Sequence, residues 1–247
     1  MLLLMIERGE RIDRVIFADT GLEFPQIYDS VVEVDEHLWR ERRMRIDVVR
    51  AETSFEDFMF RHELRSAESL RRRAACGMSA CGLGWPSHVV RWCTGKLKLD
   101  VVKAARRLVG ENVIEAIGFA ADERERMKAD ARHRYPLIEY GIDEAGALKI
   151  CHDRGFDFGG IYEHMRRASC WCCPLSSIGA LRTLRREFPE LWMRLRALDR
   201  KAHAMFGDSP QGRFAGKGWA HFERRFAAEE KAREASDEAG ARARAFR

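Results

Sequence analysis

The apolar positions in the first part of the chain occur in short blocks, and their spacing predicts helices and strands in alternation. Residues 1–8 have an apolar face typical of a helix that Gly9 ends. The run RVIFAD at residues 14–19 is apolar between polar neighbours, as in a parallel strand covered on both faces. The tight loop TGLEFP follows, and then a short helix at residues 26–32. The stretches VVEV and IDVV, the latter at residues 46–49, are further candidates for short strands.

The middle of the chain contains longer patterns, most of them helical. Residues 54–73 predict a helix with Ser54 as its N-cap and Asp57 in its first turn. After a connection rich in glycine and cysteine, residues 98–110 predict an amphipathic helix that its last glycine closes. The run NVIEAIGF at residues 112–119 predicts another buried strand, followed by the charged segment AADERERMKADARHR.

The C-terminal part of the chain is predicted to be helical. Residues 143–155 form a helix that ends at a glycine. Beyond a cysteine-rich segment, apolar residues recur at helical spacing, with an interruption at a proline in position 189. These apolar residues are Leu181, Leu184, Phe188, Leu191, Leu195 and Leu198. From residue 223 the chain is mainly Ala, Arg and Glu, which predicts a solvated helix that frays into a disordered tail.

The alternation of strands and helices predicts an α/β fold with a mainly parallel sheet flanked by helices and a helical C-terminal part. We expect an α/β domain at residues 1–177, a helical extension at 178–222 and a charged, disordered tail at 223–247. Ligands of such sheets bind at the carboxyl ends of the strands. The loops DTGLEF and GFAADERER are therefore the places where we expect a ligand site.

Composition and charge narrow the class of protein. Of the 247 residues, 46% are hydrophobic and 34% are charged, which is typical of a globular protein. The net charge is +5, and basic residues cluster in RERRMR at 40–45 and RHELRSAESLRRR at 61–73. These clusters suit a phosphate-bearing partner, or they are solvated helix faces. The apolar run LLLMI is too short for a signal sequence, and no stretch is long enough to cross a membrane. We therefore expect a cytoplasmic protein whose seven cysteines are reduced.

The segment ADTGLEFP places three residues that suit a ligand site at the end of a predicted strand. A carboxylate from Asp19, a hydroxyl from Thr20 and a flexible backbone at Gly21 are suited to hold a ribose, an amine or a metal-bound phosphate. In the alternative interpretation, Asp19 and Thr20 only satisfy backbone N–H groups. The residues alone favour this alternative.

Two further segments carry charged residues at positions where chemistry is expected. RWCTGKLK places Arg91, Lys96 and Lys98 around Cys93, where the cations would lower the pKa of the thiol or bind a phosphate or sulfate. The alternative is that Lys96 and Lys98 are only exposed residues at the start of a helix. GFAADERER, at residues 118–126, is either a solvated charge run or part of a site at the end of a strand.

The segment CWCC contains a Cys-x-x-Cys pair, Cys170 and Cys173. This spacing allows two thiolates to bind one metal ion or cluster iron. A single pair of this kind is only a moderately specific sign of a metal site, and no second pair with similar spacing is present. The other candidate ligands are Cys76, Cys81, Cys93 and Cys151 with the adjacent His152.

Several segments together resemble the phosphoadenosine phosphosulfate (PAPS) reductase-like family, in the branch common in phages and mobile elements. They are FADTGLEFPQIYD, GWPSHVVRWCTGKLK, EAIGFAADERERM, RYPLIEYGIDEAGALKICHDRGFDFGGIYEHMRRASCWCCPL and FPELW. The resemblance runs from the N-terminus to about residue 192. It implies the adenine-nucleotide alpha-hydrolase fold of the ATP pyrophosphatase superfamily, whose members act in sulfur metabolism. It also implies an adenine nucleotide, ATP or PAPS, as cofactor or substrate, and in some relatives a [4Fe–4S] cluster.

The resemblance also implies roles for individual residues. Lys96 and Arg126 are expected to act in catalysis, neutralising charge that develops on phosphate or sulfate. Cys93, Cys170 and Cys173 are expected to hold a cluster or zinc, with Cys172, Cys81 or Cys151 as the fourth ligand. The nucleotide is expected to contact Asp19, Thr20, Gly21, Glu23, Arg91, Gly118, Asp122 and Glu123.

The chain departs from the family pattern at three places. The phosphate loop Ser-Gly-Gly-x-Asp-Ser is absent. Because the chain begins just after the place of that loop, we expect Met1 to be a misassigned or truncated start. Ala120 stands where reductases often have an arginine, which Arg124 or Arg126 would replace. Cys173 is the last cysteine, so the C-terminal redox cysteine of thioredoxin-dependent reductases is missing.

The sequence leaves three functional hypotheses open. The first is a nucleotide-binding, PAPS reductase-like enzyme of sulfur metabolism or sulfur transfer. Such an enzyme would be an oxidoreductase, a nucleotidyl transferase or a sulfur transferase. Its further partner would be a protein that donates electrons or sulfur. The second is a component of DNA sulfur modification, of the phosphorothioation type, which would bind DNA. The third is a metal-stapled binding module without catalytic activity. A membrane partner is not expected.

Overall fold

The computed structural model describes residues 1–110 and 112–245, and the side chains among them up to position 238. The chain forms two compact units. The first unit consists of residues 1–52 and 94–168, and the second unit of residues 53–93 and those from 169 onward. These units do not follow the expected boundaries at 177 and 222, because residues 53–93 belong with the C-terminal helices.

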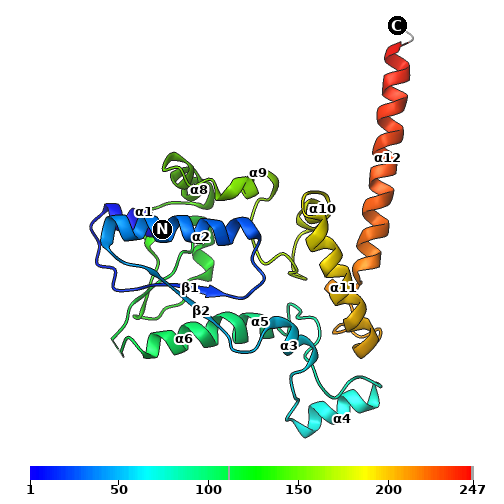
Figure 1. Ribbon diagram of the computed structural model, residues 1–247, viewed down its shortest axis with the longest axis horizontal. Coiled ribbons are helices and arrows are strands. Elements are labelled where there is room, and N and C mark those ends of the chain that lie inside the picture. The colour runs from blue at the N-terminus through cyan, green and yellow to red at the C-terminus, as the bar shows by residue number, and fades with distance from the viewer. Residues whose placement is uncertain (111, 246–247) are drawn as a thin grey trace. The chain divides into compact units, whose positions relative to one another are not determined.

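The first unit contains a pair of parallel strands between two helices (Figure 1). Strand β1 (Val15–Asp19) pairs with β2 (Ile46–Arg50), from Val15 opposite Ile46 to Asp19 opposite Arg50. Helix α2 (Pro25–Arg42) connects the strands, and α6 (Asp100–Arg107) lies on the other side of the pair. Other elements of this unit are α1 (Leu2–Glu7), η1 (Gly95–Leu99), β3 (Glu115–Ala116), η2 (Ala121–Arg126), β4 (His133–Arg134), α7 (Pro136–Glu139), α8 (Glu144–Asp153), η3 (Phe158–Gly160) and α9 (Ile161–His164).

The expected fold, a mainly parallel sheet flanked by helices, is wrong. In the described residues, the four strands form two separate two-stranded parallel sheets, and helices make up most of the structure. The run at 112–119 contributes only the two residues of β3, which pair with β4. The run is apolar, but Ile114 is 66% exposed, so it is not a strand covered on both faces. The stretch VVEV is not a strand either, because it continues the helical turns of α2, which places Val32 in solvent.

The helix starts were predicted more accurately than the helix ends. The Ser54 cap is confirmed, since its side chain accepts a hydrogen bond from the Asp57 N–H at the start of α3 (Phe55–Phe60). The helix expected to continue to residue 73 instead stops at Phe60, and α4 (Ala67–Ala75) begins after a new cap at Ser66. In the other direction, α6 is preceded without a break by η1 and by α5 (Trp92–Thr94).

The second unit has an apolar core built by its C-terminal helices. Helix α10 (Ile178–Glu187) and helix α11 (Pro189–Phe206) pack against each other, and the proline begins the second of them. The predicted stripe contributes Leu181, Leu184, Leu195 and Leu198, all buried. After η4 (Phe214–Gly216), α12 (Trp219–Ala245) follows, so the solvated helix expected from residue 223 is present. None of the helices in the described part of the chain is long and apolar enough to cross a membrane.

Candidate functional site

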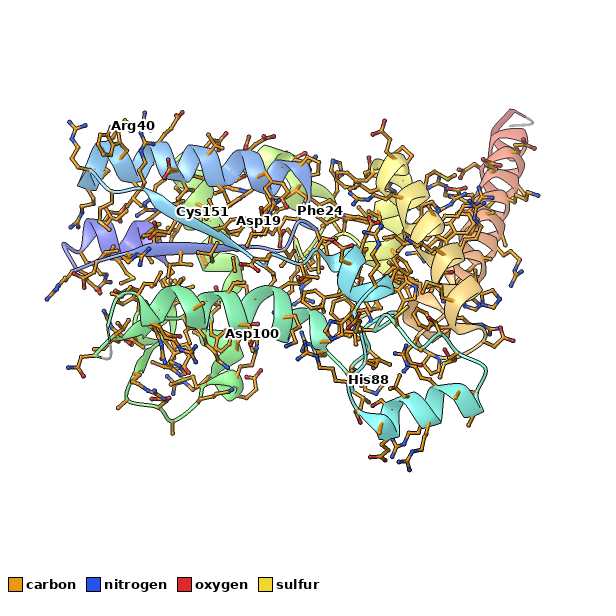
Figure 2. The ribbon with its side chains drawn as sticks, turned by 60° about the horizontal axis from the view of Figure 1, so that its bottom comes forward. Asp19, Phe24, Arg40, His88, Asp100 and Cys151 are labelled. Carbon is orange, nitrogen blue, oxygen red and sulfur yellow. The ribbon has the colours of Figure 1, made fainter. Side chains whose placement is uncertain are left out.

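The candidate site in the first unit lies at the carboxyl end of β1, in the loop that leads to α2. Figure 2 labels Asp19 and Phe24 at the two ends of this loop. The helical segment η1 packs against β1, so its side chains reach the same region. η1 is a π-helical turn inside an otherwise continuous helix, a feature that is frequent at functional sites.

Asp19 is a buried carboxylate that holds the loop together. Its side chain is only 5% exposed and accepts hydrogen bonds from the Gly21 N–H at 2.7 Å and from the Tyr28 hydroxyl at 2.8 Å. Its other oxygen accepts a hydrogen bond from Arg50 Nε at 2.9 Å. Burial raises the pKa of Asp19, but the arginine, the backbone N–H and the tyrosine together hold it below its ordinary value. The carboxylate is therefore ionised and fully engaged.

Glu23 is a second carboxylate in the same cluster. Its oxygens accept hydrogen bonds from the Thr20 hydroxyl at 2.8 and 2.9 Å and from the Tyr28 hydroxyl at 3.2 Å. The Nζ atom of Lys98, on η1, lies 3.7 Å from Glu23 Oε1. Burial and the two neighbouring carboxylates raise the pKa of Tyr28 well above its ordinary value, so the phenol stays protonated and bridges both acids.

The acids face inward and the cations face solvent. The side chains of Asp19 and Glu23 are 5% and 9% exposed, whereas those of Arg50 and Lys98 are 63% and 47% exposed. Gly21 has a φ of +74°, a backbone conformation that favours glycine. Asp19 and Thr20 each accept a hydrogen bond from a backbone N–H, of Gly21 at 2.7 Å and of Leu22 at 3.3 Å, but both also bind side chains. The exposed cations of Arg50 and Lys98 therefore remain accessible to a ligand, while Asp19 and Glu23 hold them in place. This geometry suits phosphate or sulfate.

This cluster leads to a prediction about acid stability. Because the folded-state pKa of Asp19 is lower than its ordinary value of 3.8, its ion pair with Arg50 stabilises the fold fully above that pH. The contribution is lost as the pH falls from that value through the folded-state pKa. We expect Asp19→Asn to be less stable than wild type at pH 7 and to lose less stability on acidification. Urea unfolding curves at pH 7 and pH 3 measure this, and parallel losses in both proteins would contradict it.

The segment after β3 forms its own ion pairs. Glu123 accepts hydrogen bonds from Arg126 at 2.5 Å and from Arg167 at 3.2 Å, and the Arg126 guanidinium lies 4.1 Å from the centre of the Phe119 ring. Asp122 accepts a hydrogen bond from the Glu144 N–H at 3.2 Å, which places it at the start of α8. These two acids therefore stabilise local structure. Of the expected catalytic cations, Arg126 keeps half of its side chain exposed.

The remaining predicted site residues are dispersed. Lys96 pairs with Asp100 one helical turn later, at 3.5 Å. A side chain at Gly118 would contact Met1 at 3.7 Å, so this glycine packs beside the N-terminus. Arg91 is exposed and belongs to the second unit. The structure thus brings together Asp19, Thr20, Gly21 and Glu23 with Lys98.

Two residues of the cluster were missed in the sequence. Arg50 ends β2, and the parallel register places it opposite Asp19. The signal was available, since the last residues of two parallel neighbouring strands meet at one edge. Tyr28 lies one helical turn into α2, but nothing in its spacing indicates a contact with the strand end.

The two basic segments are used in part by the fold itself. Arg42 donates to the Ile6 carbonyl at 2.5 Å, and Arg45 pairs with Asp35 at 2.6 Å. Arg73 donates from Nη1 to three backbone carbonyls of the loop at 79–82, at 2.6 to 3.3 Å. Burial lowers the pKa of this guanidinium. Arg42 and Arg73 therefore hold backbone in place, and Arg45 forms an ion pair at the surface.

The cysteine-rich segment forms a tight turn in the second unit. The Cys173 N–H donates to the Cys170 carbonyl at 3.1 Å, and Cys172 is 1% exposed. Burial is the main reason that the pKa of Cys172 is raised, and the Cys173 and Cys93 thiols raise it further. Cys172 is therefore a protonated core side chain. Of the other proposed fourth ligands, Cys81 lies in this unit and Cys151 in the first.

The expected ligands Cys93, Cys170 and Cys173 all lie in the second unit. In residues 1–110 and 112–245 no group of three or more His, Cys, Asp or Glu side chains is arranged to hold a metal ion. A cluster or zinc at these cysteines stays a prediction.

Comparison with known proteins gives one distant similarity. No family model matches the chain, and no solved structure matches it. An uncharacterized protein of Methanocaldococcus jannaschii is 25% identical over 207 residues, which cover 74% of this chain and 35% of that protein. The chain thus spans about a third of this relative's length. The function must therefore be argued from the chain's own residues.

Proposed function

We propose that this protein is a cytoplasmic, PAPS reductase-like enzyme that binds an adenine nucleotide and acts in sulfur metabolism or sulfur transfer. The observation that carries the proposal is the pair of solvent-facing cations at the end of β1, Arg50 and Lys98, each held by a buried carboxylate. Ligands of parallel strand pairs bind at this end of the strands. The choice of an adenine nucleotide as ligand and of sulfur chemistry as reaction rests on the motifs that resemble the PAPS reductase-like family.

In this proposal the chain contributes charge and position. Lys98 and Arg50 bind the phosphate or sulfate oxygens of the nucleotide, and Glu23 and Asp19 orient these cations before the ligand arrives. Lys96, whose side chain is 48% exposed on the same π-helical turn, neutralises the charge that develops during transfer. Arg126 does the same from η2.

Calorimetric titration of the protein with ATP and with PAPS tests the proposal. We expect Lys98→Ala to weaken binding of the preferred nucleotide roughly 10- to 100-fold, the loss of one hydrogen bond to a charged group. Lys103→Ala, an exposed lysine on α6 of the same unit, is the matched control and should bind as wild type does. Pyrophosphate release from ATP, and sulfite release from PAPS with an added dithiol as the two-electron reductant, then distinguish the reaction classes. A wild-type protein that binds neither nucleotide would refute the proposal.

A further inference from the structure

A concave site lies in the first unit, within the segment from η2 to α7. It is a cavity of about 610 Å³ bordered by η2, the loop that follows it, β4 and α7. A volume of this size is within the range of sites for small molecules, roughly 300–1,000 Å³. The lining of the cavity includes Arg124, a candidate replacement for the reductase arginine at position 120, but none of Asp19, Thr20, Glu23, Arg50 and Lys98.

The deep wall of the cavity is apolar and aromatic. Tyr135 and Ile138 line it and are only 5% and 7% exposed. The Tyr135 ring stacks on the ring of Phe119, with centroids 5.8 Å apart and planes 14° from parallel. Phe119 covers one face of the phenol ring and holds it in one orientation, so Tyr135 lines the cavity as a rigid apolar surface.

The loop beside the cavity is closed by hydrogen bonds of its own. The Tyr135 hydroxyl accepts from the Lys128 N–H at 2.9 Å and donates to the Lys128 carbonyl at 3.3 Å. Within the loop, the Asp130 N–H donates to that same carbonyl, and the His133 N–H donates to the Asp130 carbonyl, each at 2.9 Å. The cavity is therefore formed before any ligand binds, which lowers the entropic cost of binding.

The charges around the cavity leave unpaired positive charge at its exposed side. The two lining acids are neutralised, Asp130 by Arg132 at 2.8 Å and Glu139 by Arg134 at 2.7 Å. The pKa of Asp130 is accordingly held well below its ordinary value, mainly by that arginine. By contrast, the exposed side chains of Arg124 and Lys128 form no ion pair with another described residue.

A buried polar atom of the lining also lacks a partner. His133 Nδ1 makes no hydrogen bond within the described part of the chain, although it is shielded from solvent. The other ring nitrogen, Nε2, lies 3.8 Å from a carboxylate oxygen of Glu115. A buried polar atom without a partner costs about 1–3 kcal/mol, so a ligand oxygen that satisfies it would gain affinity.

From the flat apolar wall, the two cations and the unpartnered ring nitrogen, we propose that this cavity binds a small aromatic anion. The ring of the ligand stacks on Tyr135 and Ile138, and its phosphate or carboxylate group binds Arg124 and Lys128. This site is separate from the proposed nucleotide site, so neither proposal depends on the other.

Calorimetric titration with phenyl phosphate, benzoate and phenol tests this proposal on the whole chain. We expect wild type to bind phenyl phosphate and the double variant Arg124→Ala, Lys128→Ala to bind it at least tenfold more weakly. The matched control removes two exposed cations of α6, Lys103→Ala with Arg107→Ala, and should bind as wild type does. Lys98→Ala should also leave this binding unchanged, which distinguishes the cavity from the nucleotide site.

The three ligands identify what the cavity recognises. Binding of phenyl phosphate alone supports a phosphate ester, and binding of benzoate as well supports aromatic anions in general. Phenol binding with equal affinity would refute a role for the cations. The proposal also fails if neither anion binds at millimolar concentration, or if the Arg124 and Lys128 double variant binds phenyl phosphate as tightly as wild type.

Discussion

Replacing Asp199 with alanine is expected to lower the free energy of unfolding by roughly 3–5 kcal/mol, since each buried donor left unpaired costs about 1–3 kcal/mol. The carboxylate is 8% exposed and accepts three hydrogen bonds. The donors are Trp85 Nε1 at 3.0 Å, the Phe214 N–H at 2.5 Å and the Trp219 N–H at 2.7 Å. One side chain of α11 therefore ties Trp85 to η4 and to the start of α12.

Urea unfolding followed by tryptophan fluorescence measures this loss. Asp199→Asn keeps one acceptor oxygen and should be destabilised less than Asp199→Ala. Asp208→Ala is the control, because Asp208 also pairs with an arginine, Arg213, but its side chain is 74% exposed. A surface pair of this kind contributes about 0–1 kcal/mol. If Asp199→Ala were as stable as Asp208→Ala, the three hydrogen bonds would not stabilise the unit.

Replacing Phe24 with alanine is expected to destabilise the first unit by about 3–5 kcal/mol, the usual cost of deleting a buried aromatic ring. Phe24 is 1% exposed and immediately precedes Pro25, the first residue of α2 (Figure 2). Its ring anchors the far end of the loop that begins at Asp19. The substitution should therefore also loosen the support under Lys98 and weaken nucleotide binding.

Far-UV circular dichroism in urea measures the stability of this variant, and calorimetry measures its nucleotide affinity. Val32→Ala is the control, because Val32 lies on the same helix but is 59% exposed, so that its loss should cost little. Phe24→Ala with the stability of Val32→Ala would show that the ring is not part of the core. A destabilised variant with unchanged affinity would show that the loop does not depend on its anchor.

Local signals in the sequence predicted several elements correctly. The strands at β1 and β2, the cap at Ser54 and the interruption at Pro189, where α11 begins, are all present. Each of these depends on chemistry within a few residues: an apolar run, a side chain that accepts a nearby N–H, or a fixed backbone angle. The apolar stripe of α10 and α11 was equally readable, because its period is that of the helix itself.

The sheet was predicted wrongly because the sequence pattern of one segment does not show which other segments pair with it. An apolar run becomes a central strand only if other segments pair with it on both edges and cover it on both faces. Residues 112–119 find one partner, β4, over two residues, and Ile114 faces solvent. The break between α3 and α4 also depends on contacts between distant segments. Glu63, which lies in this break, forms a β-bridge with Cys81, and Arg73 of α4 binds the same loop at 79–82.

By itself, the sequence determined where some helices begin, where the first two strands lie and which loop follows β1, because these depend on interactions between close neighbours. Only the tertiary structure decided that Arg50 faces Asp19, that Cys172 is a core side chain and that Arg124, Lys128 and Tyr135 border one cavity. Those outcomes depend on register, burial and packing between distant segments, which spacing along the chain does not encode.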